Sequence, residues 1–361
     1  MTEKVRIGDD ALMFSETLLL FLIKQFNGER TLSGIYHLLK GKKSSQSIQD
    51  SFLFRVEPFY HLCDDLERQS FQKLIEHLGD HEWIKYMNSE QTRVILTEKG
   101  MDKLSMFKIE RMIPDGLRIT NYVTTEKQFW LRLQLLIQTL SALRYQQTAF
   151  LPITKFPAVT EAVRRIIMES SLSRNQLVHQ FYQEIRRLLT SIPILEANIF
   201  ASQFSGYHMT GLTLRQISDE SGKDLFECRT FFKAALRRIM QELSKNKSRY
   251  PFTALLMSPG VSGLSTTAGV SLRFLKSGLS AQEAAHRRNL SIGTIEDHLV
   301  EIALKDPTFD LSEYLTDELE HRIMDHANRL NTRQLKTIKK ALQEGVSYFQ
   351  IRLALAKNTV R

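Results

Sequence analysis

The sequence predicts a mainly α-helical protein, and three observations favour helix over sheet. Glycine (16) and proline (8) are scarce among the 361 residues. Apolar residues recur three or four positions apart in most long segments, which is the spacing of one helix face. Strands are predicted in one place, a hairpin between residues 83 and 97. We therefore expect a winged-helix-containing N-terminal domain, a helical middle and C-terminal tandem helix-turn-helix units.

The first domain, residues 1–127, is predicted to contain the winged helix. FSETLLLFLIKQF and TLSGIYHLLKG have helical spacing, and Gly41 is placed to end the second helix. FQKLIEHLGDHEWIKYM predicts a helix, a turn and a strand. QTRVILTEKG predicts the returning strand, with Thr97 starting the next helix. Helix, hairpin and helix in this order are typical of a wing.

Residues 128–248 predict a central helical domain with a first helix-turn-helix. Its helices must break at LPITKFPAV, because Pro152 and Pro157 forbid a continuous helix. The next segment, SRYPFTALLMSPGVSGLSTTAG, gathers proline, glycine, serine and threonine, which is typical of a linker. We place this linker at 249–268 and a C-terminal domain at 269–361.

An internal echo supports repeated units. GLTLRQIS begins at Gly211, GLSAQEAA at Gly278 and GVSYFQIR at Gly345, so successive glycines are 67 residues apart. In each copy the glycine would end a helix in a left-handed conformation, and Ser or Thr would cap the next helix, with Gln or Glu completing the cap. Three copies at one spacing predict repeated helix-turn-helix units of similar size.

The central copy contains the clearest motif, SGLSAQEAAHRRNLSIGTIEDHL at 277–299. Ala284 and Ala285 lie where two helices must approach closely. Leu290 and Ile295 would join the turn and the second helix to the core, and Ser291 can cap that helix. The pattern is similar to the helix-turn-helix of LuxR-type regulators, which implies the fold of this segment.

A wider resemblance covers the C-terminal hundred residues. GVSLRFLKSGLSAQEAAHRRNLSIGTIEDHL and ALQEGVSYFQIRLALA resemble the helix-turn-helix module at the C-termini of many RecQ-family helicases. Together with IYHLLKGKKSSQSIQD, the layout is similar to the YpbB-like bacterial proteins, in which this module lies on a separate chain. The resemblance implies an accessory DNA-binding protein whose partner is a RecQ-type helicase.

The positive charge of the chain is clustered, which favours a phosphate-bearing partner. The formal net charge is +9, and residues 332–361 hold seven cations against Glu344 alone. At helical spacing several of these cations would face one DNA backbone, although a solvated charged face is the alternative. The predicted DNA contacts here are Arg333, Lys336, Lys339, Lys340, Arg352 and Lys357. The pair Tyr348 and Phe349 would either stack on a base or pack the helix.

The motif at 277–299 leaves three interpretations open: DNA contact, protein docking and a structural bundle. For DNA, Arg287 and Arg288 would flank the backbone, while Ser291, Thr294 and His298 would reach bases. Its second helix also carries Glu296, Asp297 and Glu301, which would repel phosphates. We therefore expect these three carboxylates to bind a basic surface of a partner protein.

The run KGKKSSQSIQD at 40–50 is a further candidate phosphate contact, through Lys42 and Lys43. It lacks the spacing of a nucleotide-binding P-loop, so we expect no ATP hydrolysis there. A capped helix start is the alternative interpretation.

Catalytic, metal and membrane functions find little support in the sequence. His77 and His81 lack a third ligand, and Cys63 lacks a base. We therefore expect no enzymatic activity, no metal and no cofactor. The apolar run from Met13 to Ile23 is too short to span a bilayer. Two cysteines without a CxxC motif indicate the reducing cytoplasm, where the protein would associate with the nucleoid.

The sequence therefore predicts a non-enzymatic DNA-binding accessory protein that acts with a RecQ-type helicase in replication, recombination or repair. Two alternatives remain: a sequence-specific transcriptional regulator that uses the LuxR-like unit, and a protein-interaction scaffold without nucleic-acid affinity. The salt dependence of DNA binding separates the scaffold from the other two.

Overall fold

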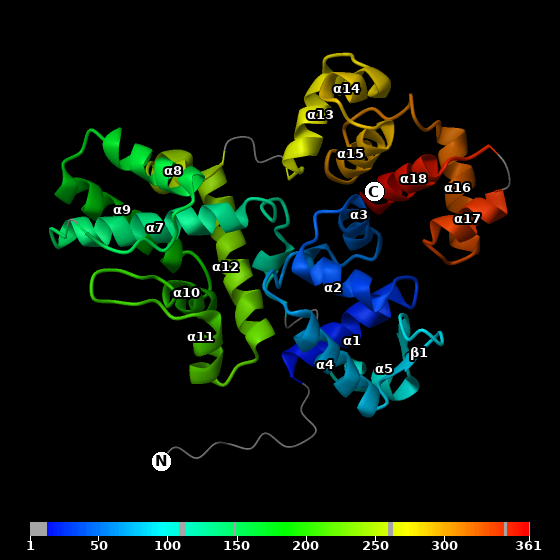
Figure 1. Cartoon of the computed structure of the whole chain (residues 1–361), viewed down its shortest axis with the longest axis horizontal. Coiled ribbons are helices and arrows are strands. Elements are labelled where there is room, and N and C mark those ends of the chain that lie inside the picture. The colour runs from blue at the N-terminus through cyan, green and yellow to red at the C-terminus, as the bar shows by residue number, and fades with distance from the viewer. Residues whose placement is uncertain (1–12, 108–112, 148, 259–262, 343–344, 361) are drawn as a thin grey trace. The chain divides into compact units, whose positions relative to one another are not determined.

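The computed structural model describes residues 13–107, 113–147, 149–258, 263–342 and 345–360, and these residues are mainly helical (Figure 1). The N-terminal helices are α1 (Phe14–Phe26), α2 (Leu32–Lys40), α3 (Ser45–Leu53), α4 (Arg68–Asp80) and α5 (Glu98–Ser105). The middle helices are α7 (Glu126–Arg144), α8 (Pro157–Met168), α9 (Arg174–Thr190), α10 (Ile194–Ala201), α11 (Leu214–Ser221) and α12 (Leu225–Lys245). The last are α13 (Thr266–Lys276), α14 (Ala281–Arg288), α15 (Ile292–Lys305), α16 (Asp317–Arg329), α17 (Leu335–Leu342) and α18 (Tyr348–Val360). Short 3-10 turns cover Glu57–Phe59, Asp115–Arg118, Lys247–Arg249 and Thr253–Leu256. The predicted mainly helical class is confirmed.

The predicted hairpin is present between α4 and α5. Strands β1 (Ile84–Tyr86) and β2 (Val94–Leu96) form a two-stranded sheet. Thr97 starts α5 as predicted, because its hydroxyl accepts a hydrogen bond from Gly100 N at 3.0 Å. Gly41 ends α2 in the left-handed conformation, with φ of 72°. The order helix, β-ribbon, helix that the sequence predicted for a wing is confirmed.

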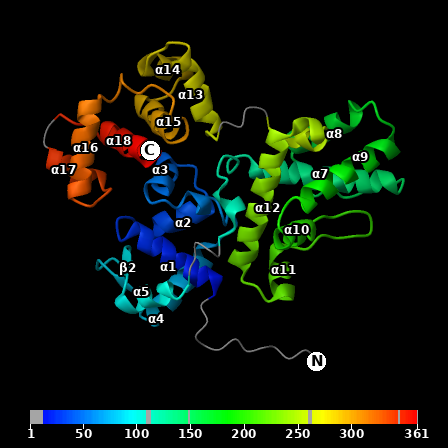
Figure 2. The same cartoon turned by 180° about the vertical axis from the view of Figure 1, so that it is seen from behind.

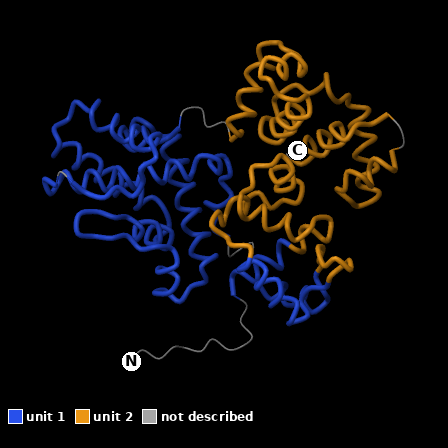
Figure 3. The backbone as a smooth tube through the Cα atoms, in the orientation of Figure 1, with its two compact units in different colours: residues 1–22, 69–85, 96–259 blue, residues 23–68, 86–95, 260–361 orange. Residues whose placement is uncertain are grey.

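The chain divides into two compact units, and their segments alternate along the sequence (Figure 3). Unit 1 contains residues 1–22, 69–85 and 96–259, and unit 2 contains residues 23–68, 86–95 and 260–361. One change of unit falls inside the predicted linker at 249–268, of which residues 259–262 lie outside the described residues. That the four predicted segments, 1–127, 128–248, 249–268 and 269–361, form consecutive domains and a linker stays a prediction.

Unit 1 is built around α7 and α12, which Figure 2 shows with α8 to α11 around them. Trp130 of α7 packs between Phe200 and the edge of Phe232, with ring centroids 4.8 and 4.9 Å away. A buried ion group joins the two long helices, because Lys233 Nζ and Arg237 Nε contact the two oxygens of Glu126 at 2.5 and 3.0 Å. Buried charges persist when they are paired in this way.

The core of unit 2 joins helices from opposite ends of the chain. Helix α3 packs against both α15 and α18, and α15 packs along α18 (Figure 1). Gln49 of α3 is buried and accepts a hydrogen bond from Arg352 Nε of α18 at 2.9 Å. Ile295 and Leu353 have no exposed surface in this core. The C-terminal helices therefore complete their core with an N-terminal helix.

Candidate nucleic-acid interface

The predicted helix-turn-helix at 277–299 forms from α14 and α15. Ser280 caps α14 and forms a capping box with Glu283. Asn289 then reverses the chain in the left-handed conformation, with φ of 52°, and Ser291 caps α15 by accepting from Thr294 N at 3.2 Å. Ala284 is fully buried, as close helix packing requires. The local sequence thus dictates both helices and the turn between them.

The internal echo is a repeated helix cap. Thr213, Ser280 and Ser347 each accept a hydrogen bond from the backbone N–H three residues later, at 3.1 to 3.2 Å. In return, the side chains of Gln216, Glu283 and Gln350 accept from the backbone N–H of the cap residue. The predicted cap with its Gln or Glu partner is confirmed in all three copies.

The three copies differ in their glycines and in the number of helices after the cap. Gly278 and Gly345 are left-handed, with φ of 89° and 100°, as predicted. The prediction is wrong for Gly211, which lacks a positive φ and is required because a side chain would collide with the Gln203 carbonyl. Two helices come after the cap in the first two copies, whereas α18 alone comes after the third. The third copy is therefore half a unit in the described residues.

The predicted base-reading side chains of α15 are occupied within the protein. The hydroxyls of Ser291 and Thr294 share a hydrogen bond of 2.9 Å while they cap the helix. His298 is 7% exposed and shares a hydrogen bond of 2.9 Å with Ser271 Oγ of α13. The prediction that His298 reaches a base is wrong, because its ring faces the core. Of α15, the exposed start of the helix at Ser291, Ile292 and Gly293 is therefore the part that can contact DNA.

The two arginines at the end of α14 have different roles. Arg287 is exposed, as a backbone contact would require. Arg288 is half-buried, donates to the Thr267 carbonyl at 2.9 Å and also contacts Ser271 Oγ. Its guanidinium therefore ties α14 to α13, and its prediction as a free phosphate contact needs correction.

Of the three acidic residues of α15, Glu301 faces inward, contrary to the expectation of a partner surface, whereas Glu296 and Asp297 are partly exposed. Glu301 is 5% exposed, accepts from Ser265 N and Ser265 Oγ at 2.5 and 2.8 Å, and pairs with Lys305 at 3.4 Å. Asp297 forms an ion pair with Arg352 at 2.6 Å, and Glu296 is half-buried. The structure corrects the prediction for Glu301, which is a core residue that binds the start of α13.

The basic C-terminal set divides in a similar way. Lys336 and Lys340 of α17 are exposed, and Lys339 Nζ lies 4.3 Å from the centre of the Tyr348 ring. Arg352 contacts Asp297 and Gln49, whereas Lys357 contacts Glu320 at 2.5 Å and Asp317 at 3.4 Å. These contacts raise the pKa of Lys357, chiefly through the hydrogen bond to Glu320. The prediction of Arg352 and Lys357 as free phosphate contacts is therefore corrected, and α17 keeps the exposed cations.

The two aromatic residues at the start of α18 have separate environments. Tyr348 is 46% exposed beside Lys339, whereas Phe349 is half-buried with its ring 6.2 Å from that of Tyr314. Among the described residues from 263 onward, Tyr348 is the exposed aromatic side chain. We call Lys336, Lys339, Lys340 and Tyr348 the α17 surface.

The lysines at 42 and 43 lie in the turn between α2 and α3. Both are exposed, and Ser44 directly after them caps α3 by accepting from Ser47 N at 3.2 Å. The capped helix start is confirmed, and phosphate contact by Lys42 and Lys43 stays a prediction.

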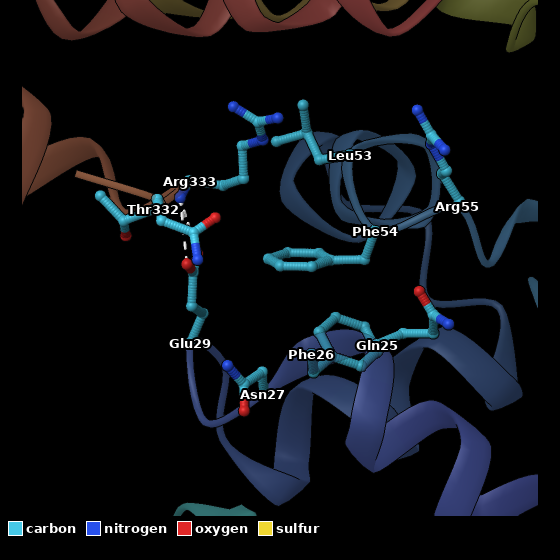
Figure 4. A pocket seen from close by; sticks show the side chains of 10 residues that line it. Gln25, Phe26, Asn27, Glu29, Leu53, Phe54, Arg55, Thr332 and Arg333 are labelled. Atoms are coloured by element: carbon cyan, nitrogen blue, oxygen red, sulfur yellow. Dashed lines mark hydrogen bonds between the residues drawn. The ribbon is translucent and has the colours of Figure 1, made fainter. Parts of the chain in front are cut away.

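A pocket that the sequence did not predict lies in unit 2 (Figure 4). Its volume is about 210 Å³, and it is lined by the end of α1, the residues after α3 and the residues before α17. The lining residues are Gln25, Phe26, Asn27, Glu29, Leu53, Phe54, Arg55, Asn331, Thr332 and Arg333. Arg333, predicted as a DNA contact, is half-buried there, and its backbone N–H donates to Glu29 at 2.9 Å. No local sequence signal marks the pocket, because its walls come from distant segments.

The described part of the chain offers neither a metal site nor a membrane-spanning helix. His77, considered as a ligand with His81, lies 2.9 Å from Glu16 Oε1. Within residues 13–107, 113–147, 149–258, 263–342 and 345–360, no three His, Cys, Asp or Glu side chains are arranged to hold a metal ion. None of the helices over those ranges has the length and apolar character needed to cross a membrane.

Comparison with known proteins agrees with this fold. Residues 267–355, from α13 to α18, match a family described as a helix-turn-helix domain, so the chain carries such a domain at its C-terminal end. The chain is also 28% identical to Protein YpbB of Bacillus subtilis (strain 168) over 347 residues. That alignment covers 96% of this chain and 98% of YpbB. No solved structure matches the chain. Neither match names a helicase.

Proposed function

We propose that the chain is a non-enzymatic DNA-binding protein that contacts the phosphate backbone. The observation that carries this proposal is the helix-turn-helix domain with its exposed lysines on α17. Lysines that lie free on one helix release counterions when they bind phosphates, which gives affinity without regard to sequence.

The contacts of α15 favour backbone binding over sequence-specific binding. Base readout prefers long donor side chains on the second helix of the motif. The exposed N-terminal residues of α15 are Ser291, Ile292 and Gly293, and His298 is buried. A transcriptional regulator would need readers that this helix does not present. Its N-terminus can hold a phosphate through backbone N–H groups and its dipole.

The partner and the process are further parts of the proposal. The resemblance of α13 to α18 to the module of RecQ-family helicases supports an accessory role with such a helicase in replication, recombination or repair. The chain itself shows no helicase motor motif, so the partner would supply ATP-driven unwinding. The protein would then work in the cytoplasm, at the nucleoid.

The DNA-binding proposal is tested by neutralising the α17 surface. Changing Lys336, Lys339 and Lys340 to Gln should weaken binding across sequences, because three phosphate contacts are lost. The slope of log affinity against log salt should become shallower by about 2 to 3, at roughly 0.9 for each lost contact. Fluorescence anisotropy with labelled duplex and single strands at several salt concentrations measures both quantities.

A matched control removes the same charge elsewhere. Lys155, Arg164 and Arg174 are exposed cations of unit 1 outside the helix-turn-helix domain. Changing them to Gln should leave affinity and salt slope near wild type. Equal effects of the two triple variants would show that net charge, and not the α17 surface, drives binding. A protected palindrome in a footprint would instead support the transcriptional regulator.

The helicase partnership needs its own experiment. The purified RecQ-type helicase of the same organism should bind the immobilised chain both before and after nuclease treatment. Binding that disappears with nuclease would mean that DNA bridges the two proteins. A lack of binding in both cases would contradict the partnership and leave the DNA-binding proposal standing.

A further inference from the structure

Helix α17 carries its cations on the side opposite its apolar residues. Its sequence, LKTIKKAL, contains no acidic residue, and Ile338 and Leu342 are buried. Lys336 and Lys340 lie one helical turn apart on the other side, where both are exposed. Neither lysine forms an ion pair with another residue that the structure describes. Their charge is therefore available to a polyanion.

The basic side of α17 adjoins an aromatic ring at the start of α18. Lys339 Nζ lies 4.3 Å from the centre of the Tyr348 ring, which is within the range of a cation–π contact. Tyr348 is nevertheless 46% exposed, so the ammonium group covers only part of the ring. No hydrogen bond joins its hydroxyl to another described residue. The α17 surface therefore combines free cations with an accessible ring.

The fold holds the Tyr348 ring in place. Tyr348 is the first residue of α18 and directly follows the cap residue Ser347. Ser347 Oγ accepts from Gln350 N at 3.1 Å, and Gln350 Oε1 accepts from Ser347 N at 3.0 Å. Further along the helix, Ile351 and Leu353 have no exposed surface. A ring on such an anchored helix start loses little conformational freedom when a ligand stacks on it.

Free cations beside an exposed ring match the chemistry of a single nucleic-acid strand. Proteins that bind single strands combine cations that follow the backbone with aromatic rings on which bases stack. The bases of a duplex are already paired and stacked, so a protein side chain reaches a base face only by wedging between base steps. A duplex can therefore use the lysines of the α17 surface, whereas an unpaired base can also use Tyr348.

The spacing of the lysines also suits one strand. Lys336 and Lys340 are related by i and i+4, which places their Cβ atoms about 5–6 Å apart. The two strands of a duplex are separated by a major groove about 12 Å wide. The charges of one helical turn therefore serve neighbouring phosphates of the same strand.

We propose that the α17 surface binds single-stranded DNA, with an unpaired base stacked on Tyr348 and neighbouring phosphates on Lys336 and Lys340. Lys339 positions the ring through its cation–π contact. This inference rests on the proposed DNA binding and adds a substrate class to it. Stacking tolerates every base, so the surface selects for unpaired bases and not for sequence.

The experiment compares two probes and removes the ring. The full chain is titrated with a labelled oligo(dT) strand and with a labelled blunt duplex of equal length, at several salt concentrations. Tyr348→Ala should weaken binding of the single strand at least about fivefold, because a base loses its stacking partner. Duplex affinity should stay near wild type. The salt slope should be unchanged on both probes, because no phosphate contact is removed.

Two further variants control for the loss of a tyrosine. Tyr348→Phe keeps the ring and should keep the single-strand affinity of wild type. Tyr182→Ala removes a tyrosine of α9 that is 59% exposed in unit 1, and it should leave both probes unaffected. Thermal melts followed by circular dichroism show whether each variant is folded.

Tyr348→Trp provides a readout that does not depend on the stability of the alanine variant. A base that stacks on the new indole should quench its fluorescence when the single strand is added, whereas the duplex should not. Wild type, which contains Trp83 and Trp130, supplies the background signal.

Three results would overturn this inference while leaving DNA binding intact. They are an equal loss on strand and duplex in Tyr348→Ala, no loss on either probe, and a Tyr348→Trp signal that the single strand does not change. In each case the proposed function stands if the salt slope still depends on the α17 lysines. If wild type binds neither probe, the proposed function fails, and the single-strand inference fails with it.

Discussion

His298 shows how one side chain of the helix-turn-helix is committed to folding. Its ring lies in the core of unit 2, bonded to Ser271 and 3.5 Å from Arg288. Burial, and then the charge of Arg288, lower the pKa of His298, while Glu301 and Asp297 oppose this effect. The folded protein therefore favours the neutral ring, and protonation would place two cations side by side in the core.

This arrangement predicts a loss of stability in mild acid. The pKa of His298 is lower in the folded state than its ordinary value of 6.5 in an unfolded chain. Below about pH 6.5 the unfolded chain takes up a proton that the folded chain refuses, so the free energy of unfolding falls as pH falls. One such group contributes up to about 1.4 kcal/mol for each pH unit.

Urea unfolding between pH 7.5 and 5.5 measures this dependence in wild type and in His298→Gln. The variant can keep a hydrogen bond to Ser271 without titrating, so its free energy of unfolding should fall less over this range. Other titrating groups, including His37, whose pKa burial also lowers, are common to both proteins and cancel in the difference. Parallel curves for the two proteins would rule out the assigned role of His298.

Residue roles were the part of the site that the sequence predicted least well. Arg352, Lys357 and Glu301 looked like free charges because their partners, Asp297, Glu320 and Ser265, are remote in sequence or on other helices. Charge alone does not reveal such pairs. By contrast, Ser291 and Ser280 were predicted as caps from neighbours within three residues, and the structure confirms them.

At the scale of elements, the sequence predicted the three repeated helix caps, at Thr213, Ser280 and Ser347, better than any other feature of the structure. Caps depend on φ, ψ and side chains within one turn, so the local pattern suffices to predict them. The same holds for the hairpin, for Gly41 at the end of α2 and for the breaks before α8. The repeat of the caps did not reveal that α18 alone follows the third cap in the described residues, because a cap determines only the helix that it begins.

Removing a cap should destabilise its helix by a definite amount. Ser280→Ala leaves the backbone N–H of Glu283 without its acceptor and should cost about 1 kcal/mol in the free energy of unfolding. Ser280→Asp restores an acceptor and should recover most of the loss. Chemical denaturation followed by circular dichroism measures both variants.

Comparison with Ser277→Ala controls for serine loss in the same segment. Ser277 is exposed at the end of α13, where its hydroxyl donates to the Phe274 carbonyl and caps no helix start. If both alanine variants lower the free energy of unfolding equally, the capping box at Ser280 contributes no more to stability than any other serine hydrogen bond in this segment.

At the scale of the whole molecule, the packing of α3 against α15 and α18 joins distant segments of the chain in the core of unit 2. Sequence patterns predicted these helices but not their association, because amphipathic spacing shows that a face is apolar and not which segment covers it. The family match at 267–355 likewise leaves out the N-terminal helix that completes this core. The YpbB alignment, which covers 96% of the chain, includes both segments.

A fragment of residues 260–361 should therefore fold poorly by itself. Without α3, the apolar faces of α15 and α18 that it covers meet water, and Arg352 loses its contact with Gln49. We expect increased binding of a hydrophobic dye and a broad thermal transition, measured against the full chain. Adding a fragment of residues 13–107 should sharpen the transition. A cooperative transition of the lone fragment at the temperature of the full chain would show that α3 is dispensable.

The pairing of α3 with α18 also orders events during synthesis. α3 leaves the ribosome early, yet one of its two partners, α18, is translated nearly 300 residues later, since α3 ends at Leu53 and α18 begins at Tyr348. At roughly 5 to 20 residues per second, the apolar side of α3 stays uncovered for many seconds while the rest of the chain emerges. Unit 1, all of whose segments have been translated by residue 259, can fold in that interval, whereas unit 2 must wait for α18. Nascent chains stalled before α18 should therefore be those that chaperones hold.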